Sequence, residues 1–200
     1  MTDPAQDEEL VRRFLAGDQH AFTILVERHQ TRVFNVSLRV LGDPDDARDA
    51  TQDTFLSMLR KLSQFRGDSA FTTWLHRVTV NACYDILRKR RRQPRLRLVD
   101  DENDPMPETG PAVIDHADAT VGSIDVSRAL QEIPEEYRVT LVLADIQDVA
   151  YEEIARILDV PIGTVKSRVH RGRIALARAM GLDMPGREPT PAPRPSEWES

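Results

Sequence analysis

Hydrophobic positions recur every three or four residues along most of the chain, and this spacing predicts helices. The predicted helices span, in order, 6–16, 18–41, 43–63, 69–91, 125–132, 134–145, 150–158 and 161–179. No segment shows convincing strand alternation, although the apolar run TLVLADI taken alone has the look of a strand. The pattern therefore predicts an all-α fold.

Two segments lack this periodicity. Residues 93–123 are rich in Pro, Gly and Asp, a composition typical of a flexible linker. Residues 181–200 are rich in Pro and are expected to be a disordered tail. We therefore expect two small helical domains, 1–92 and 124–180, joined by an acidic linker.

Charge is segregated along the chain, which has a formal net charge of −6. Residues 81–97 carry seven basic residues and only one acidic residue, and residues 164–180 carry five basic residues and no acid. Between these blocks, residues 98–125 hold eight acidic residues and no Lys or Arg. Because a polyanion meets the local field, both basic blocks are candidates for nucleic-acid binding despite the acidic total.

Composition excludes several classes of function. No apolar run approaches the length of a membrane helix, and the acidic N-terminus lacks the features of a signal peptide, so we expect a cytoplasmic protein without membrane insertion. Cys83 is the only cysteine, and the five His have no ligand spacing, so no metal site is expected. No phosphate-binding glycine loop and no nucleophile with a matching base occur. We therefore expect no catalytic residues, no cofactor and no enzyme activity.

The helix predicted at 43–63 has two different faces. One carries apolar residues that we expect in the core: Phe55, Met58, Leu59 and Leu62. The opposite face is an acidic stripe, made of Asp45, Asp49, Gln52 and Asp53. For an arbitrary helix, a stripe of this kind is usually a solvated surface, so its spacing alone does not define a docking site.

The helix predicted at 69–91 also has a core stripe, made of Phe71, Trp74, Leu75, Val78, Ala82 and Ile86. We expect the remaining face to point outward with Thr73, Arg77, Val80, Asn81, Tyr84 and Arg88. Cations, an aromatic ring and an amide together suit single-stranded nucleic acid. An ordinary amphipathic helix ending in a solvated Arg run is an equally good interpretation of this helix alone.

The stretch VPIGTVKSRVHRGR, at 160–173, lies in a helix-turn-helix pattern. Apolar stripes precede and follow the turn, and Pro161 fits the first turn of the second helix. Because Ala150 is a poor N-cap for the first helix, Asp148 is an alternative cap two residues earlier. Opposite the second stripe lie Lys166, Ser167, His170 and Arg171, with Arg168 and Arg173 on the flanks. Such side chains can contact guanine acceptors or phosphates in a major groove; a basic hairpin without a DNA role is the alternative.

Several long segments resemble extracytoplasmic-function sigma factors of bacterial RNA polymerase. FRGDSAFTTWLHRVTVNACYDILRKRRR is similar to the promoter-melting part of their region 2, and DPDDARDATQDTF to its polymerase-docking segment. The stretch that begins IPEEYRVTLVLADIQDVAYEEIARILDV and continues through the helix-turn-helix resembles region 4. The resemblance covers about 20–92 and 125–179, in the family's order, with the acidic linker between.

The resemblance implies roles for these surfaces. Asp49, Gln52 and Asp53 would bind the clamp helices of the polymerase β′ subunit. Arg77, Asn81, Tyr84 and Arg88, with the loop at 65–69, would engage the −10 promoter element, and Asn81 would help to capture a flipped base. Lys166, Ser167, Arg168, His170, Arg171 and Arg173 would contact the −35 element.

The resemblance also implies the partners of the chain. Besides core RNA polymerase, including its β subunit, and promoter DNA, an anti-sigma factor is expected, since members of the family are commonly held inactive by one. The acidic linker would thread through the polymerase channels toward the RNA exit path. His170 departs from the aromatic or apolar residue of some relatives, and this bears on the −35 preference.

Two rival hypotheses belong to other classes. A stand-alone helix-turn-helix regulator would bind duplex DNA without polymerase and would leave 1–92 without a role. A helical adaptor for other proteins would show no salt-sensitive DNA binding. Copurification with core polymerase distinguishes a sigma factor from both.

Overall fold

The computed structural model of the protein describes residues 4–92 and 121–182, and every regular element within these ranges is helical. The α-helices are α1 (Pro4–Leu15), α2 (Gln19–Leu41), α3 (Pro44–Lys61), α4 (Phe71–Arg92), α5 (Val121–Glu132), α6 (Glu135–Leu141), α7 (Tyr151–Leu158) and α8 (Ile162–Ala179). A 3₁₀ turn, η1 (Leu62–Gln64), follows α3, and a π-helical turn, η2 (Val142–Ile146), follows α6. Most of the predicted linker and tail lies outside the described residues.

Short polar side chains and one glycine set the ends of the first long helices. The Asp18 carboxylate accepts a hydrogen bond from the His20 N–H (3.0 Å) at the start of α2. Asp43 accepts from the N–H groups of Asp45 and Asp46 (both 2.9 Å) at the start of α3. Between these helices Gly42 adopts φ +73°, which a glycine tolerates without strain. These caps explain why the predicted boundaries lie within a few residues of the observed ones.

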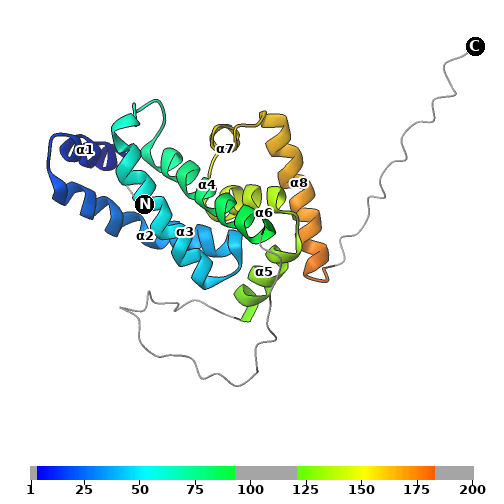
Figure 1. Ribbon diagram of the computed structural model, residues 1–200. Helices are drawn as coiled ribbons and strands as arrows, with labels where there is room; N and C mark the ends of the chain where they lie inside the picture. The colour runs from blue at the N-terminus through cyan, green and yellow to red at the C-terminus, as the bar shows by residue number, and fades with distance from the viewer. Residues whose placement is uncertain (1–3, 93–120, 183–200) are drawn as a thin grey trace, which may run out of the picture.

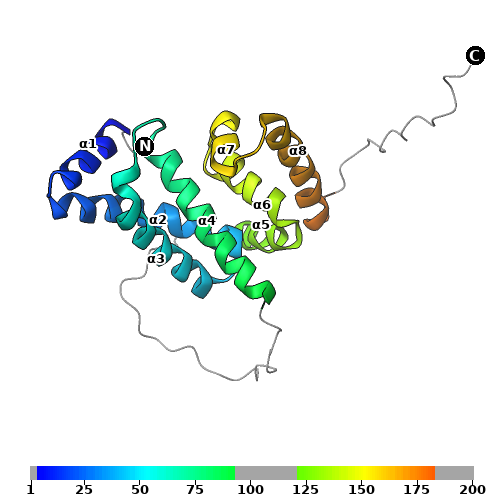
Figure 2. The same cartoon turned by 45° about the horizontal axis from the view of Figure 1, so that its top comes forward.

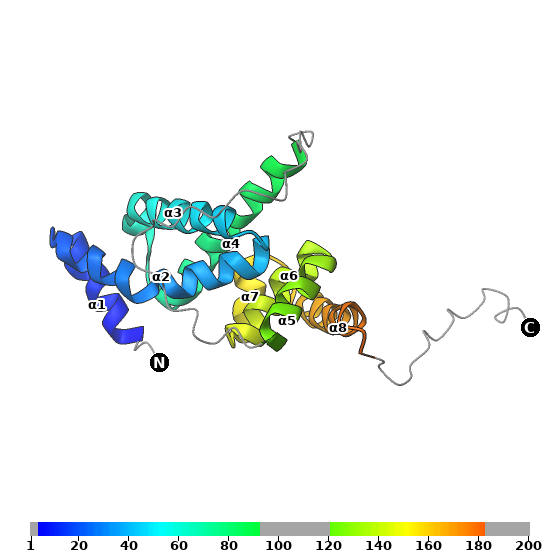
Figure 3. The same cartoon turned by 90° about the horizontal axis from the view of Figure 1, so that it is seen from below.

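The helices form two groups that lie side by side, with α1–α4 in one and α5–α8 in the other (Figures 1 and 2). The first group has its own apolar core, which includes Leu25, Met58 and Phe71. At its edge α1 is anchored through a buried carboxylate: Asp7 is bonded to His29 Nε2 (2.9 Å) and to Arg28 Nη1 (2.7 Å). Figure 3 shows α1 at the far end of the molecule from α8.

A second apolar core joins the two groups. It contains residues of α2 and α4, such as Val40 and Val80, together with residues of α5 and α6, such as Leu130 and Val139. Helix α4 contacts α7, and α2 contacts α5 and α6. The two helical units predicted from the sequence therefore share a continuous interior, which the sequence pattern did not indicate.

The segment predicted as one helix over 134–145 is interrupted by the π turn. There the N–H of Gln147 donates to the carbonyl of Val142, five residues earlier (3.0 Å). The alternative cap at Asp148 is wrong: this residue adopts φ +52°, and α7 begins at Tyr151 after Ala150, without a side-chain cap. Because the backbone of Ala150 is extended, with φ −60° and ψ 145°, α7 cannot start earlier.

Candidate polymerase and nucleic-acid interfaces

Helix α3 presents the acidic stripe to solvent. Asp49, Gln52 and Asp53 are all exposed, whereas Met58 and Leu62 on the opposite side are fully buried. This is the arrangement that the periodicity predicts.

One apolar residue of α3 was assigned to the wrong side. Leu59 is 45% exposed instead of buried, and Leu56 is 43% exposed. Each follows a polar residue of the stripe by seven positions, or about two helical turns, so both extend that exposed face. The spacing from Asp49 to Leu56 and from Gln52 to Leu59 could have revealed this in the sequence. The stripe is thus a mixed acidic and apolar surface, which suits a protein partner better than an all-acidic face does.

Helix α4 presents only part of the face that was predicted to point outward. Arg77, Asn81 and Arg88 are exposed, but Thr73 is only 6% exposed and Val80 only 1%. The expectation was wrong for these two because the second helical group covers them. Thr73 Oγ1 donates to Glu153 Oε1 of α7 (2.9 Å), and Val80 lies in the shared core.

Tyr84 and Arg88 occupy different environments on α4. Tyr84 is half-buried, and burial raises the pKa of its hydroxyl, although the charge of Arg168 from α8 acts to lower it. Arg88 is exposed and forms an ion pair with Asp85 one turn earlier. Tyr84 packs against the core that the two helical groups share.

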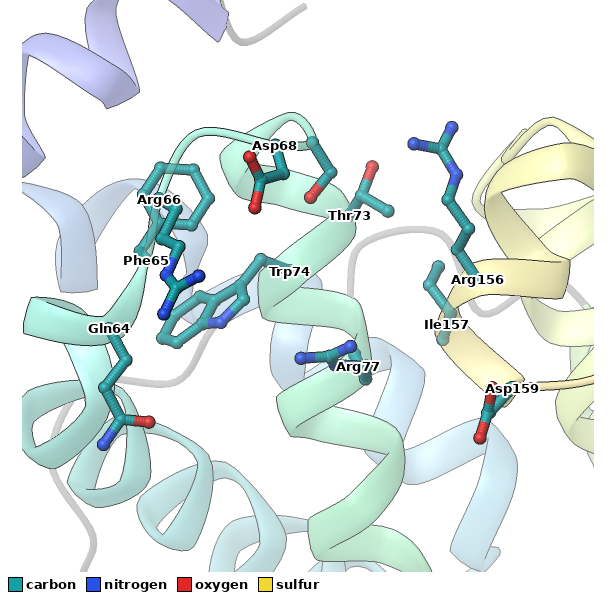
Figure 4. A pocket seen from close by; sticks show the side chains of 11 residues that line it. Gln64, Phe65, Arg66, Asp68, Thr73, Trp74, Arg77, Arg156, Ile157 and Asp159 are labelled. Carbon is teal, nitrogen blue, oxygen red and sulfur yellow. The ribbon is translucent and has the colours of Figure 1, made fainter.

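A cavity of about 350 Å³ lies between the loop before α4 and helix α7. Figure 4 shows Phe65, Arg66 and Trp74 along one side, with Arg77 between them and α7. Arg156 and Ile157 of α7, and Asp159 just after it, lie on the other side. The Phe65 and Trp74 rings meet edge to face with centroids 5.8 Å apart. The sequence indicated the loop and α4 but not the α7 residues, since no periodicity relates the two helices.

Helix α8 has a closely packed back and an open front. Val165 and Val169 are buried, and a Cβ added at Gly172 would lie 2.9 Å from two carbons of Leu141. Lys166, Ser167, His170, Arg171 and Arg173 are exposed on the other sides, and Arg168 is half-buried. The helix starts after Pro161, whose carbonyl accepts from the Thr164 N–H (2.8 Å). The predicted reading residues are thus brought together on one helix.

Two of these side chains already have partners within the chain. Arg173 makes two hydrogen bonds to the Asp145 carboxylate, at 3.0 and 2.6 Å, and this pairing raises the pKa of Arg173. The Ser167 hydroxyl donates to the carbonyl of Thr164 (2.9 Å). Arg173 must therefore exchange a carboxylate for a phosphate if it contacts DNA.

Within residues 4–92 and 121–182, no three His, Cys, Asp or Glu side chains cluster as metal ligands would. Over the same residues, no helix combines the length and apolar character needed to cross a membrane.

A helix-turn-helix with a basic outer face, beside a second helical unit with its own basic helix, is typical of a DNA-binding protein. The family description "Sigma-70 region 2" matches residues 25–93, and "Sigma-70, region 4" matches residues 123–176. The chain belongs to the sigma-70 family and, within it, to the extracytoplasmic-function (ECF) sigma factors.

Curated relatives match over most of the chain. The RNA polymerase sigma-H factor of Pseudomonas aeruginosa is 34% identical over 191 residues, covering 90% of this chain and 96% of its own. The ECF RNA polymerase sigma factor SigM of Mycobacterium tuberculosis is 38% identical, covering 88% and 85%. The ECF RNA polymerase sigma-E factor of Escherichia coli K12 is 37% identical, covering 88% and 95%.

Solved structures share the fold. The sigma factor RpoE in complex with the anti-sigma factor NepR, from Bartonella quintana, aligns with a TM-score of 0.65 at 26% identity, covering 82% of this chain and 98% of that one. CnrH in complex with the cytosolic domain of CnrY aligns with a TM-score of 0.66 at 24% identity, covering 90% and 99%.

The function follows from the family. The protein is an RNA polymerase sigma factor: it binds core polymerase and promoter DNA and directs promoter-specific initiation. It is not an enzyme; the chemistry belongs to the polymerase. The stand-alone regulator and the adaptor are set aside, because neither accounts for the region 2 match over residues 25–93.

Proposed function

We propose that the two helical parts of the chain have different roles in initiation, as the sequence suggests. Residues 1–92 dock on polymerase and act at the −10 element, and residues 124–180 read the −35 element. Residues 93–123 connect these two parts, and the tail at 181–200 follows the second part. The family matches at 25–93 and 123–176 support this division. We also propose that the protein works in the cytoplasm, where bacterial polymerase is found.

The docking site on polymerase is the exposed face of α3. Asp49, Gln52 and Asp53 would contact the clamp helices of the β′ subunit. Two observations support this: the three side chains are exposed together, and Leu56 and Leu59 continue the same face with apolar surface. A face that is acidic at one end and apolar at the other offers both electrostatic steering and area to bury.

The test of this site is a charge reversal. We expect Asp49→Arg with Asp53→Arg to abolish holoenzyme assembly in a pull-down with core polymerase, because a rim of matched charges becomes repulsive. Glu8→Arg with Glu27→Arg, at two exposed positions on α1 and α2, is the matched control and should leave assembly intact. Normal binding by a folded Asp49→Arg, Asp53→Arg chain would remove α3 from the interface.

The −10 site comprises Arg77, Asn81, Tyr84 and Arg88 of α4 with the loop at 65–69. The exposed amide of Asn81 beside the exposed Arg77 supports capture of an unpaired base, with the aromatic cavity at Phe65 and Trp74 nearby.

The Asn81→Ala variant distinguishes two roles of this residue by permanganate footprinting. If Asn81 reads a captured base, both an ordinary promoter and a template already unpaired at −10 lose binding. If it aids melting, only the ordinary promoter does. No effect on either template would show that Asn81 is not part of the −10 site.

The −35 site is the front of α8. Lys166, Ser167, His170 and Arg171 would enter a major groove, with Arg168 and Arg173 on the flanking phosphates. The exposure of this face opposite a closely packed back supports the assignment, because the helix can enter a groove while it stays anchored to α6.

Regulation by an anti-sigma factor is part of the same proposal. The support is that RpoE and CnrH, which share this fold, were solved in complex with NepR and with the cytosolic domain of CnrY. The test is coprecipitation of the full chain from its own host, with the Asp49→Arg, Asp53→Arg chain alongside to separate polymerase from a second protein. Recovery of polymerase subunits alone would count against an anti-sigma partner.

A further inference from the structure

A buried carboxylate anchors α1 to α2. Asp7 is fully buried, and its carboxylate is hydrogen-bonded to His29 Nε2 (2.9 Å) and accepts from Arg28 Nη1 (2.7 Å). Burial acts to raise the pKa of Asp7, but the hydrogen bonds and charges of His29 and Arg28 outweigh burial and lower that pKa. The carboxylate is therefore ionised near neutral pH and holds the His29 ring in one orientation.

The His29 ring connects this anchor to the first residue of α4. His29 is itself buried, and its ring lies beside the Phe71 ring, with centroids 5.4 Å apart. Phe71 in turn meets Phe65 edge to face and Trp74 at a tilt, both with centroids 5.9 Å apart. A continuous chain of contacts therefore runs from α1, through one histidine, to three aromatic rings at the start of α4.

Two of these rings belong to the proposed −10 site. Phe65 begins the loop at 65–69, and Phe65 and Trp74 line the cavity beside Arg77 (Figure 4). Both rings are partly exposed, whereas Phe71 behind them is fully buried. Side chains that border an unpaired base have to be held by the residues behind them, because a displacement of about 1 Å weakens recognition. Phe71 and His29 provide this support.

The anchor lies outside the segment that matches region 2. That match begins at residue 25, whereas Asp7 is on α1. Helix α1 also contacts η1, the turn that leads into the loop at 65–69, and contacts α4. Leu10 and Val11 of α1 lie in the same apolar core as Phe71. Both the packing and the buried ion pair thus place α1 against the base of the loop.

We propose that Asp7 and His29 are positioning residues for −10 recognition. The carboxylate of α1 fixes the His29 ring, which supports Phe71 and, through it, the two rings that line the cavity. Asp7 and His29 are both buried, so they act through these rings and not by contact with DNA. The proposal rests on the assignment of the −10 site to α4 and the loop at 65–69, and its test separates the two.

The first measurement is the fluorescence of Trp74 in the full chain. Trp198→Phe, present in every variant, leaves Trp74 as the only tryptophan. We expect Asp7→Ala to shift the emission to longer wavelength and to increase quenching by acrylamide, because the ring loses its support. Asp7→Asn keeps an oxygen that can accept from His29, so this variant should restore most of the wild-type spectrum.

The second measurement is the base preference of holoenzyme. Two duplex pools, derived from a promoter that the wild-type holoenzyme opens, are randomised over the −10 or the −35 element, and the bound duplexes are sequenced. We expect Asp7→Ala to reduce the preference for the favoured −10 bases roughly two- to tenfold, the range expected for loss of one aromatic contact. The −35 preference should not change, and Asp7→Asn should regain most of the −10 preference.

Phe14→Ala is the matched structural control. The Phe14 ring of α1 packs on Phe22 of α2, with centroids 5.4 Å apart, so this variant loosens the same two helices without removing a member of the chain from Asp7 to Phe71. It should lower stability but leave the Trp74 spectrum and the −10 preference unchanged. If Asp7→Ala does not assemble with core polymerase, His29→Gln replaces it, because glutamine keeps a donor for Asp7 but lacks the ring. The same loss of −10 preference is expected.

Two results would overturn the positioning role. One is an unchanged −10 preference in the Asp7→Ala holoenzyme, in an assay where Arg77→Ala and Asn81→Ala do change it. The other is an equal change in Asp7→Ala and Phe14→Ala, which would mean that loss of stability alone is responsible. A different result bears on the −10 assignment. If Arg77→Ala and Asn81→Ala leave the −10 preference unchanged, α4 is not the reader, and the positioning role falls with that assignment.

Discussion

Helices α4 and α8 are built alike but are not equally available. Each has a buried apolar stripe and a basic opposite face, and both were predicted to present that face to nucleic acid. The front of α8 is open, with Lys166 and Arg171 exposed, whereas part of the α4 face is covered, with Thr73 and Val80 buried. The amphipathic pattern of one helix reports which residues can pack, but it does not report how many neighbours come to pack against them.

The open front of α8 is tested most strongly by Lys166→Ala with Arg171→Ala. Each side chain that contacts a base should contribute on the order of 1–3 kcal/mol to the binding free energy, and its loss should remove the base preference at one or two −35 positions. Loss of a phosphate contact should instead weaken binding to all sequences alike. Binding of holoenzyme to a library of −35 variants at two salt concentrations measures this. Arg178→Ala, on the last turn of the same helix, is the control. Unchanged preferences and unchanged salt dependence in the double variant would show that α8 is not the reading helix.

His76, on the buried side of α4, should make the stability of the protein depend on pH. Burial, with smaller contributions from the charges of Arg32 and His29, lowers the pKa of His76 to about 4. Between that value and the ordinary pKa the unfolded chain binds a proton that the folded chain does not, so stability is complete above the ordinary pKa and falls with acidification. From about pH 7 to about pH 4.5 the wild type should lose roughly 2–3 kcal/mol on this account.

Replacement of His76 by Gln should remove most of this pH dependence. Urea unfolding at the two pH values gives the free energies. His20→Gln, at an exposed position on α2, is the control and should retain the wild-type slope. An equal loss of stability in wild type and His76→Gln would mean that other groups carry the acid sensitivity.

The closely packed back of α8 is tested by two glycines of the same helix. An added methyl at Gly172 would meet Leu141 at 2.9 Å and Tyr137 Cβ at 3.3 Å, whereas one at Gly163 meets nothing within 4 Å. Overpacking makes Gly172→Ala destabilising, and helix propensity makes Gly163→Ala stabilising by up to about 1 kcal/mol. The two variants should differ by on the order of 2 kcal/mol in urea unfolding. Equal stabilities of the two variants would show that α6 adjusts to the added methyl group on α8 without strain.

The smallest effect is expected at the edge of the α8 face. Asp145→Asn weakens the exposed pair with Arg173 and leaves that guanidinium available to a phosphate. The slope of the logarithm of the DNA-binding constant against the logarithm of salt concentration should steepen by up to about one, which corresponds to one more counterion released. Titration of −35 duplex at several salt concentrations measures the slope, with Asp148→Asn in the same loop region as control. A slope that does not change would mean that Arg173 already leaves Asp145 when DNA binds.

Much of the fold could be predicted because its helices are amphipathic and capped locally. Asp18 and Gly42 determine where α2 begins and ends, and Asp43 determines where α3 begins, through bonds to their own neighbours in the chain. The candidate sites on α3 and α8 could be predicted for the same reason, since each lies on one helix whose far side is buried. The error at Leu59 came from counting an apolar residue as core when its spacing from Gln52 put it on the exposed face.

By itself the sequence determined most of the helices, because these depend on spacing within one segment, and its motifs indicated the family. It also predicted the residues of each proposed reading face. Only the tertiary structure decided that Arg138 caps the end of α2 and that α7 covers part of α4. Those contacts join residues 98 and 80 positions apart. No local periodicity encodes them, because which two amphipathic faces meet depends on shape, charge and burial across the whole chain.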